Sequence, residues 1–194
     1  MISKKNIIIY LSWIFLILIS LFFDKSVTDF FSGLQHGALT TFFEIISFFG
    51  NFFIVLIFST ILFFYDKKKR EWIVPLWATF FITFAVVFLL KIIIGRERPS
   101  YEVLYPLFNI ASASFPSLHT AAAFSIMCLL DREFPKFVFV WTLFAILVAV
   151  SRIYLNAHYL SDVIAGALLG FVIGHAVIYL EEKYRFFRKW TTKN

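Results

Sequence analysis

The stretch SRIYLNAHYLSD, residues 151–162, places Arg152, His158 and Asp162 close together in a chain that is otherwise apolar. A charged side chain near the hydrocarbon of a membrane is costly unless a partner or a water-filled site compensates for it. If His158 begins a helix, Asp162 lies one turn further along the same face. Its carboxylate can then accept a hydrogen bond from one imidazole nitrogen and orient the other. The stretch therefore predicts a nucleophilic or basic histidine held by an aspartate.

The composition around this stretch is that of a membrane protein. Of the 194 residues, 61% are hydrophobic and 21% are aromatic, whereas soluble domains contain about 45–50% apolar residues. Spans of about 20 residues leave room for about six helices with short loops. We therefore expect an all-α bundle of six transmembrane helices, forming a single integral-membrane domain over residues 1–194. The one cysteine, Cys128, predicts neither a disulfide framework nor a thiolate metal cluster.

Six apolar stretches mark the expected spans. They are about 6–23, 42–65, 72–91, 117–130, 137–150 and 158–180. The mixed segment 24–41 has two interpretations. Its apolar residues recur at near-helical spacing, which favours a helix in the outer interface, and an irregular loop is the alternative.

Glycines recur at every fourth position of the sixth stretch, at Gly166, Gly170 and Gly174. Small residues at this spacing let another helix approach closely. Intramolecular packing that positions His158 is our first interpretation, and a dimer interface is the second. The sequence assigns no oligomeric state.

The basic residues divide between the two sides of the membrane. With six spans and both termini on one side, that side receives most of the 18 Lys and Arg residues, including the run 67–70. The positive-inside rule makes it cytoplasmic. We assign the net charge of +6 to an inner surface that meets anionic lipid headgroups and to an outer cationic cluster. We expect a multi-pass protein of the cell membrane with its active site on the outer face and no nucleic-acid partner.

Three polar clusters gather on the outer side. The first is KIIIGRERP at 91–99, the second FPSLHT at 115–120, and the third the stretch 151–162. Together they offer three or four cations and two histidines, His119 and His158. This is the composition of a phosphate site, in which fixed positive charge binds oxygens, one imidazole attacks phosphorus and the other protonates the leaving group.

Local signals indicate where the helices end and begin at these clusters. Gly95 and Pro99 predict that the third span ends in a loop there. Pro116 and Ser117 predict a helix start, whose free backbone N–H groups would face an anion. We expect Arg96 to form a solvated pair with its neighbour Glu97, or at most to support the site, and we place His36 and His175 outside it.

These residues resemble the three signature motifs of the type 2 phosphatidic acid phosphatase family, which is related to vanadium haloperoxidases and bacterial acid phosphatases. The resemblance covers about residues 91–162. The matching positions are Lys91, Arg98 and Pro99; Pro116, Ser117, Leu118 and His119; and Ser151, Arg152, His158 and Asp162. It implies a lipid phosphatase whose substrate lies within the bilayer.

The resemblance also implies a role for each residue. His158 would attack phosphorus and form a phosphohistidine, and Asp162 would fix the tautomer of the His158 ring. His119 would protonate the leaving group and then activate water. Four further side chains would bind the phosphoryl oxygens, namely those of Lys91, Arg98, Ser117 and Arg152. No metal or other cofactor is implied, and the outer acidic residues are scattered.

Leu118 departs from the family's second motif, which commonly has glycine at this position. Leucine adds a side chain near the phosphate and resembles branches that include lipid phosphotransferases. We therefore expect hydrolysis of a lipid phosphate or of an isoprenoid diphosphate such as undecaprenyl diphosphate. The first alternative is a lipid phosphotransferase that uses the same phosphohistidine. The second is a membrane anion transporter, although the sequence lacks paired repeats of broken helices.

Overall fold

The computed structural model describes residues 4–100 and 113–187, with only the backbone of residues 4–11. These residues form helices and no strand, so the predicted all-α class is confirmed for this part of the chain. In chain order the helices are α1 (Lys4–Gly33), α2 (Gly37–Phe49), α3 (Phe52–Tyr65), η1 (Lys67–Trp72), α4 (Ile73–Ile94), α6 (Leu118–Glu133), η2 (Pro135–Phe137), α7 (Val138–Tyr154) and α8 (Leu160–Tyr184).

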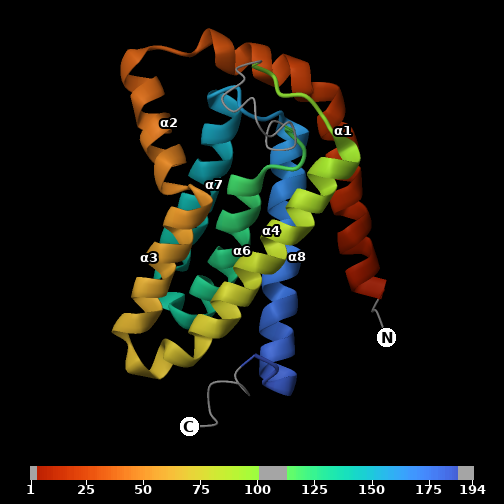
Figure 1. The fold of residues 1–194 in the computed structure, drawn as a ribbon. Coiled ribbons are helices and arrows are strands. Elements are labelled where there is room, and N and C mark those ends of the chain that lie inside the picture. The colour runs from red at the N-terminus through yellow and green to blue at the C-terminus, as the bar shows by residue number, and fades with distance from the viewer. Residues whose placement is uncertain (1–3, 101–112, 188–194) are drawn as a thin grey trace.

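Helix α6 is the core of the bundle, and α3, α4, α7 and α8 all contact it (Figure 1). Every residue from Thr120 to Leu130 except Phe124 is buried. A helix that is apolar on every face is stable where protein or lipid covers those faces, and here other helices do so. The fourth apolar stretch is therefore the central helix, and most of its surface meets protein.

The three glycines of α8 all face α6. A Cβ built on any of them would lie less than 3.0 Å from a backbone oxygen of α6. The prediction that these glycines allow close packing of helices within the molecule is confirmed. Because α6 occupies this face of α8, the face is not available to a second copy of the chain.

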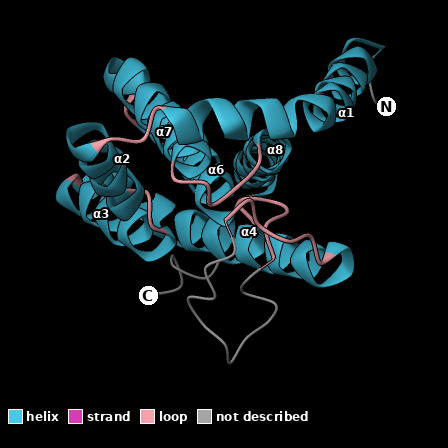
Figure 2. Ribbon diagram, turned by 90° about the horizontal axis from the view of Figure 1, so that it is seen from above, coloured by secondary structure: helices cyan, strands magenta, loops and turns pink. Residues whose placement is uncertain are grey.

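Helix α1 rises along the bundle and then turns across its end, above α8 (Figures 1 and 2). Val27 and Phe31, on this later part, pack against a buried apolar cluster on α7 and α8. Of the two interpretations of segment 24–41, the helix is confirmed as far as Gly33. The expected boundary near residue 23 was wrong, because the helix continues through Asp24 without a break.

The second apolar stretch is divided into α2 and α3, which are bent by 61° at their junction. Gly50 closes α2, and a Cβ there would lie 2.6 Å from a methyl carbon of Val148 on α7. Asn51 then begins α3, since its side chain accepts a hydrogen bond from the Phe53 N–H at 3.0 Å. The break therefore has two causes, close contact with α7 and a local helix cap.

Length and composition qualify fewer than six helices as membrane spans. Among the described residues, the spans are Lys67–Ile94, Pro135–Tyr154 and Leu160–Tyr184, with the bent α2–α3 pair as a fourth if it counts as one. Helix α6 has 16 residues, or about 24 Å, which is shorter than the hydrocarbon core of about 30 Å. Six spans therefore stay a prediction.

Candidate active site

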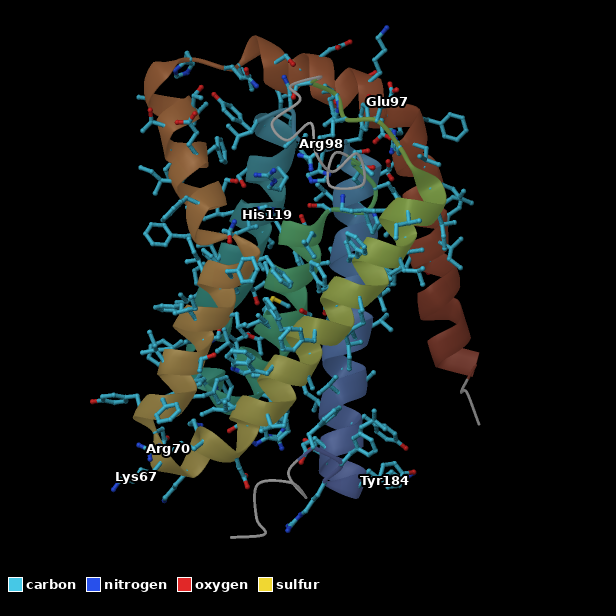
Figure 3. All side chains as sticks on the ribbon, in the orientation of Figure 1. Lys67, Arg70, Glu97, Arg98, His119 and Tyr184 are labelled. Atoms are coloured by element: carbon cyan, nitrogen blue, oxygen red, sulfur yellow. The ribbon has the colours of Figure 1, made fainter. Side chains whose placement is uncertain are left out.

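The three polar clusters meet at one end of the bundle. Figure 3 shows Arg98 and His119 toward the end that α1 crosses, and Lys67, Arg70 and Tyr184 at the opposite end. The structure thus places the basic run 67–70 and the predicted site at opposite ends of the bundle, as expected from their positions between successive helices. All seven predicted site residues lie toward the end that α1 crosses, at the ends of α4, α6, α7 and α8 or in the loops beside them.

The end of α4 supplies Lys91. Helix α4 ends at Ile94 because Gly95 adopts a left-handed conformation, with φ of 59°, and donates a hydrogen bond to the Lys91 carbonyl at 3.0 Å. The Lys91 side chain is buried, and its ammonium donates to the carbonyls of Ala113 and Ser114. An ammonium has three donors, so one remains for an anion.

The start of α6 supplies Ser117 and His119. Ser117 is fully buried and caps the helix, as predicted. Its hydroxyl oxygen accepts from the Thr120 hydroxyl at 3.0 Å, and its backbone N–H donates to the Asp162 carbonyl at 3.0 Å. The second and third clusters are therefore joined by a direct backbone hydrogen bond. His119 is half-buried at the second position of the helix.

Arg152 lies in the last turn of α7 and organises the loop that follows. Its carbonyl accepts hydrogen bonds from the N–H groups of Ala157 and His158, both at 3.1 Å. Its guanidinium donates to the Ser47 hydroxyl on α2. Its Nε is buried and has no hydrogen-bond partner within the described part of the chain. A buried donor without a partner is costly, and a bound anion would satisfy it.

His158 and Asp162 face each other at the start of α8. His158 Nδ1 lies 3.5 Å from Asp162 Oδ2, and both side chains are almost completely buried. The prediction that His158 begins the helix was wrong by two residues, since α8 begins at Leu160. The pair still meets because the Tyr159 N–H donates to Asp162 Oδ2 at 2.9 Å and folds the carboxylate back toward the loop. Nδ1 faces the aspartate without a completed hydrogen bond among the described residues, and the Ser114 backbone also lies beside the ring.

The cations lie close enough to influence the histidines. Burial lowers the pKa of His158 well below the usual value of 6.5, and the charges of Arg152, Lys91 and Arg98 lower this pKa further. The charges of the same three cations also act on His119. At neutral pH the His158 ring is therefore uncharged and retains a nucleophilic lone pair.

Arg96 contacts the site directly, so the expectation of a solvated pair with Glu97 was wrong. Its guanidinium donates to Asp162 Oδ1 at 2.9 Å and to Asp24 Oδ2 at 2.7 Å. Glu97 is exposed. Asp24 lies on α1, and sequence reasoning missed it because an aspartate after an apolar stretch looked like the end of a span. The available signal was the charge of Asp24 itself, next to an apolar stretch where a charge needs a partner.

The chain matches the model of the PAP2 superfamily over residues 72–186. It belongs to that family. All seven predicted site residues and Arg96 fall within the matched PAP2 region, whereas Asp24 lies outside it.

Individual PAP2 proteins are also similar to this chain. One relative is the lipid A 4'-phosphatase of Porphyromonas gingivalis, 29% identical over 80% of this chain and 72% of that protein. Alignments with several further curated relatives span only 48% to 62% of those proteins.

Two solved PAP2 structures share the fold. The crystal structure of Aquifex aeolicus LpxE has a TM-score of 0.68 and 26% identity, covering 80% of this chain and 94% of that one. A transmembrane PAP2 type phosphatidylglycerolphosphate phosphatase from Bacillus subtilis has a TM-score of 0.71, covering 90% of this chain and 96% of that one. At 22% identity, the second likeness concerns the fold alone.

The other histidines lie outside this PAP2 site, as expected. His36 is exposed at the start of α2. His175 is exposed on α8, where its Nδ1 lies 3.4 Å from the Cys128 sulfur and 2.9 Å from the Phe171 carbonyl. Within residues 4–100 and 113–187, no group of three His, Cys, Asp or Glu side chains is arranged to hold a metal ion.

Proposed function

We propose that this PAP2 protein is an integral-membrane lipid phosphatase that hydrolyses a lipid phosphate or an isoprenoid diphosphate through a phosphohistidine. The observation that carries the proposal is the contact of 3.5 Å between His158 Nδ1 and Asp162 Oδ2, beside three cations whose charges act on the same ring. Relatives named as phosphatases of lipids support the same class of reaction.

In the first step, His158 Nε2 attacks phosphorus and the bond from phosphorus to the lipid oxygen breaks. Asp162 accepts the hydrogen bond of Nδ1–H and stabilises the positive charge that develops on the ring. His119, at the start of α6, takes up a proton as the negatively charged phosphate binds among the cations, and gives that proton to the departing lipid oxygen. The products of this step are a lipid alcohol and phosphohistidine.

In the second step, water attacks the phosphohistidine and the bond from nitrogen to phosphorus breaks. His119, now neutral, takes a proton from that water, so the ring regains the proton that it gave to the lipid. Inorganic phosphate leaves and His158 returns to its starting state. One histidine thus serves as acid and then as base, which the order of the two steps requires.

Fixed donors would bind the phosphoryl oxygens throughout. The Lys91 ammonium has a donor to spare, and the buried Arg152 Nε has no partner among the described residues. The charges of Arg98, Arg152 and Asp162 act on Lys91, which supports a shared site for these groups. Such donors stabilise the charge that spreads over the oxygens during transfer without having to reorganise.

A lipid substrate suits a site at the end of a membrane bundle, since the phosphate meets water while the tail stays in the bilayer. The names of relatives favour phosphorylated lipid A or phosphatidylglycerophosphate, and an isoprenoid diphosphate remains a candidate. By the positive-inside rule, the run Lys67–Arg70 at the opposite end favours an outer site and cytoplasmic termini. We treat residues 1–194 as one membrane domain.

Water is favoured over a second lipid as the acceptor. Leu118 was the one feature that favoured phosphotransfer, and it packs against the central apolar cluster of the bundle. Its side chain is thus part of the core. Phosphotransfer is the alternative outcome that the test below would detect.

The test is phosphate release by the purified protein in detergent, with excess chelator, from a panel of lipid monophosphates and diphosphates. His158→Ala should abolish release, while His36→Ala, which replaces an exposed histidine outside the site, should keep it. Acid-labile phosphate should appear on the wild type after rapid quenching and be absent from His158→Ala. Release by His158→Ala at a substantial rate would refute the phosphohistidine, and a second phosphorylated lipid in place of free phosphate would indicate phosphotransfer.

A further inference from the structure

Asp24 has no role in the mechanism above, yet it is one of the most densely bonded side chains near the site. It is only 4% exposed, although it lies on a helix that crosses the end of the bundle. Its Oδ1 accepts from the Ser161 N–H at 2.8 Å. Its Oδ2 accepts from the Ser161 hydroxyl at 2.6 Å and from Arg96 at 2.7 Å.

These contacts cap α8 from another helix. Ser161 is the second residue of α8, so its N–H is one of the first donors that lack a partner inside the helix. Tyr159 precedes the helix and lacks the short side-chain oxygen of a usual cap. The Asp24 carboxylate takes over that function and also meets the positive end of the helix dipole.

Arg96 divides its guanidinium between two carboxylates. One terminal nitrogen donates to Asp24, and the other donates to the Ser161 hydroxyl at 2.7 Å and to Asp162 Oδ1 at 2.9 Å. Its guanidinium also lies 4.1 Å from the centre of the Tyr159 ring. A planar guanidinium can satisfy this set of acceptors only in one orientation.

The orientation of Asp162 depends on this division. Arg96 holds Oδ1 and the Tyr159 N–H holds Oδ2, so the two contacts fix the plane of the carboxylate that faces His158. Without Asp24, the Arg96 guanidinium would have Asp162 as its one remaining carboxylate partner among these contacts. The carboxylate would then be drawn toward Arg96 and away from Nδ1, which is already 3.5 Å distant.

We propose that Asp24 is a positioning residue for phosphoryl transfer, acting through Arg96 to orient the Asp162 carboxylate toward His158. The role rests on the proposed function, because it assumes that Asp162 serves His158. It gives α1, which contributes no signature motif, a direct connection to the site.

The activity test compares Asp24→Asn with Asp29→Asn, an exposed aspartate on the same helix, each normalised to folded protein. Asp24→Asn should lower kcat about tenfold or more, by the scale of substitutions that disturb the support of a reactive group, and should change KM little. Asp29→Asn should match the wild type. If total activity falls only in proportion to the amount of folded protein, kcat per folded molecule is unchanged. That result would overturn the proposal and leave Asp24 as a helix cap.

A double-substitution cycle tests the route through Arg96. Arg96→Gln removes the group that Asp24 restrains, so adding Asp24→Asn to Arg96→Gln should lower kcat little further. Effects on kcat that multiply independently would show that Asp24 does not act through Arg96, which contradicts the proposal.

A measurement without substrate keeps this inference separate from the proposed function. Nitrogen NMR of protein labelled at its four histidines reports the tautomer of each ring, and the spectrum of His158→Ala assigns His158. Asp24→Asn should reduce the Nδ1–H tautomer of His158, and Asp29→Asn should not. An unchanged His158 signal would overturn the inference even if the enzyme is active. If wild-type protein releases no phosphate from any lipid, the proposed function fails while this spectrum still decides the inference.

Discussion

Replacing Gly166 by alanine should damage turnover more than stability. A Cβ at this position would lie 2.6 Å from the Ser117 carbonyl oxygen and 3.3 Å from Thr120 Cβ. Ordinary van der Waals contact begins at 3.4 Å, so the start of α6 must move away by about 0.8 Å. That movement would stretch the hydrogen bond of 3.0 Å between the Ser117 N–H and the Asp162 carbonyl and displace His119.

The expected magnitudes differ for the two properties. A displacement of about 1 Å at reacting groups can cost about a hundredfold in rate. Overpacking costs about 1–3 kcal/mol of unfolding free energy, of which about 1 kcal/mol is offset because alanine favours a helix more than glycine does. We therefore expect kcat to fall by about a hundredfold, with a small decrease in the unfolding temperature.

Gly174→Ala is the matched control. Its Cβ would meet the Ser125 carbonyl oxygen at 2.6 Å, as close as the backbone contact at Gly166, and also Cys128 Cβ at 2.9 Å, about two turns further from the site. Gly37→Ala, where nothing lies within 4 Å, controls for the substitution itself. The measurements are phosphate release per folded molecule and thermal unfolding in detergent. Equal losses of kcat in Gly166→Ala and Gly174→Ala would refute the argument that this contact positions the site.

Three further outcomes follow from the site. The lowered pKa of His158 means that its ring stays neutral until the pH is well below 6.5, so the acid limb of kcat/KM should lie below that value; a limb above it would point to another group. His119→Ala should slow lipid substrates more than aryl phosphates, which leave without a proton, and equal losses would argue against an acid role. Arg152→Lys should lower kcat/KM by about tenfold to a hundredfold, the worth of a charged hydrogen bond, because an ammonium cannot reproduce the guanidinium contacts; wild-type kinetics would remove Arg152 from the site.

The parts of the site that the sequence predicted are local. Gly95 ends α4 and Ser117 caps α6, because a helix end depends on the conformation and side chain of one or two residues. His158 and Asp162 meet because they are four positions apart, although the helix begins between them. A contact predicted between residues about one helical turn apart does not depend on the exact residue at which the helix begins.

The parts that the sequence did not predict join distant segments. Arg96 and Asp24 are 72 residues apart, and Arg152 and Ser47 are 105 apart. No spacing rule connects such residues. The bend between α2 and α3 was likewise missed, because the close contact between Gly50 and Val148 that accompanies it depends on how α7 packs.

The sequence by itself determined that this chain is apolar and helical and has three polar clusters that resemble the PAP2 motifs, since composition and spacings within about one helical turn are properties of a local stretch of chain. Only the tertiary structure decided that Arg96 pairs with Asp24 and Asp162. It also decided that α1 crosses the end of the bundle and that Asp24 caps α8. Those features depend on the packing of α1 against α7 and α8, where burial makes an unpaired charge too costly to tolerate. Asp24 and Arg96 are therefore paired by the fold.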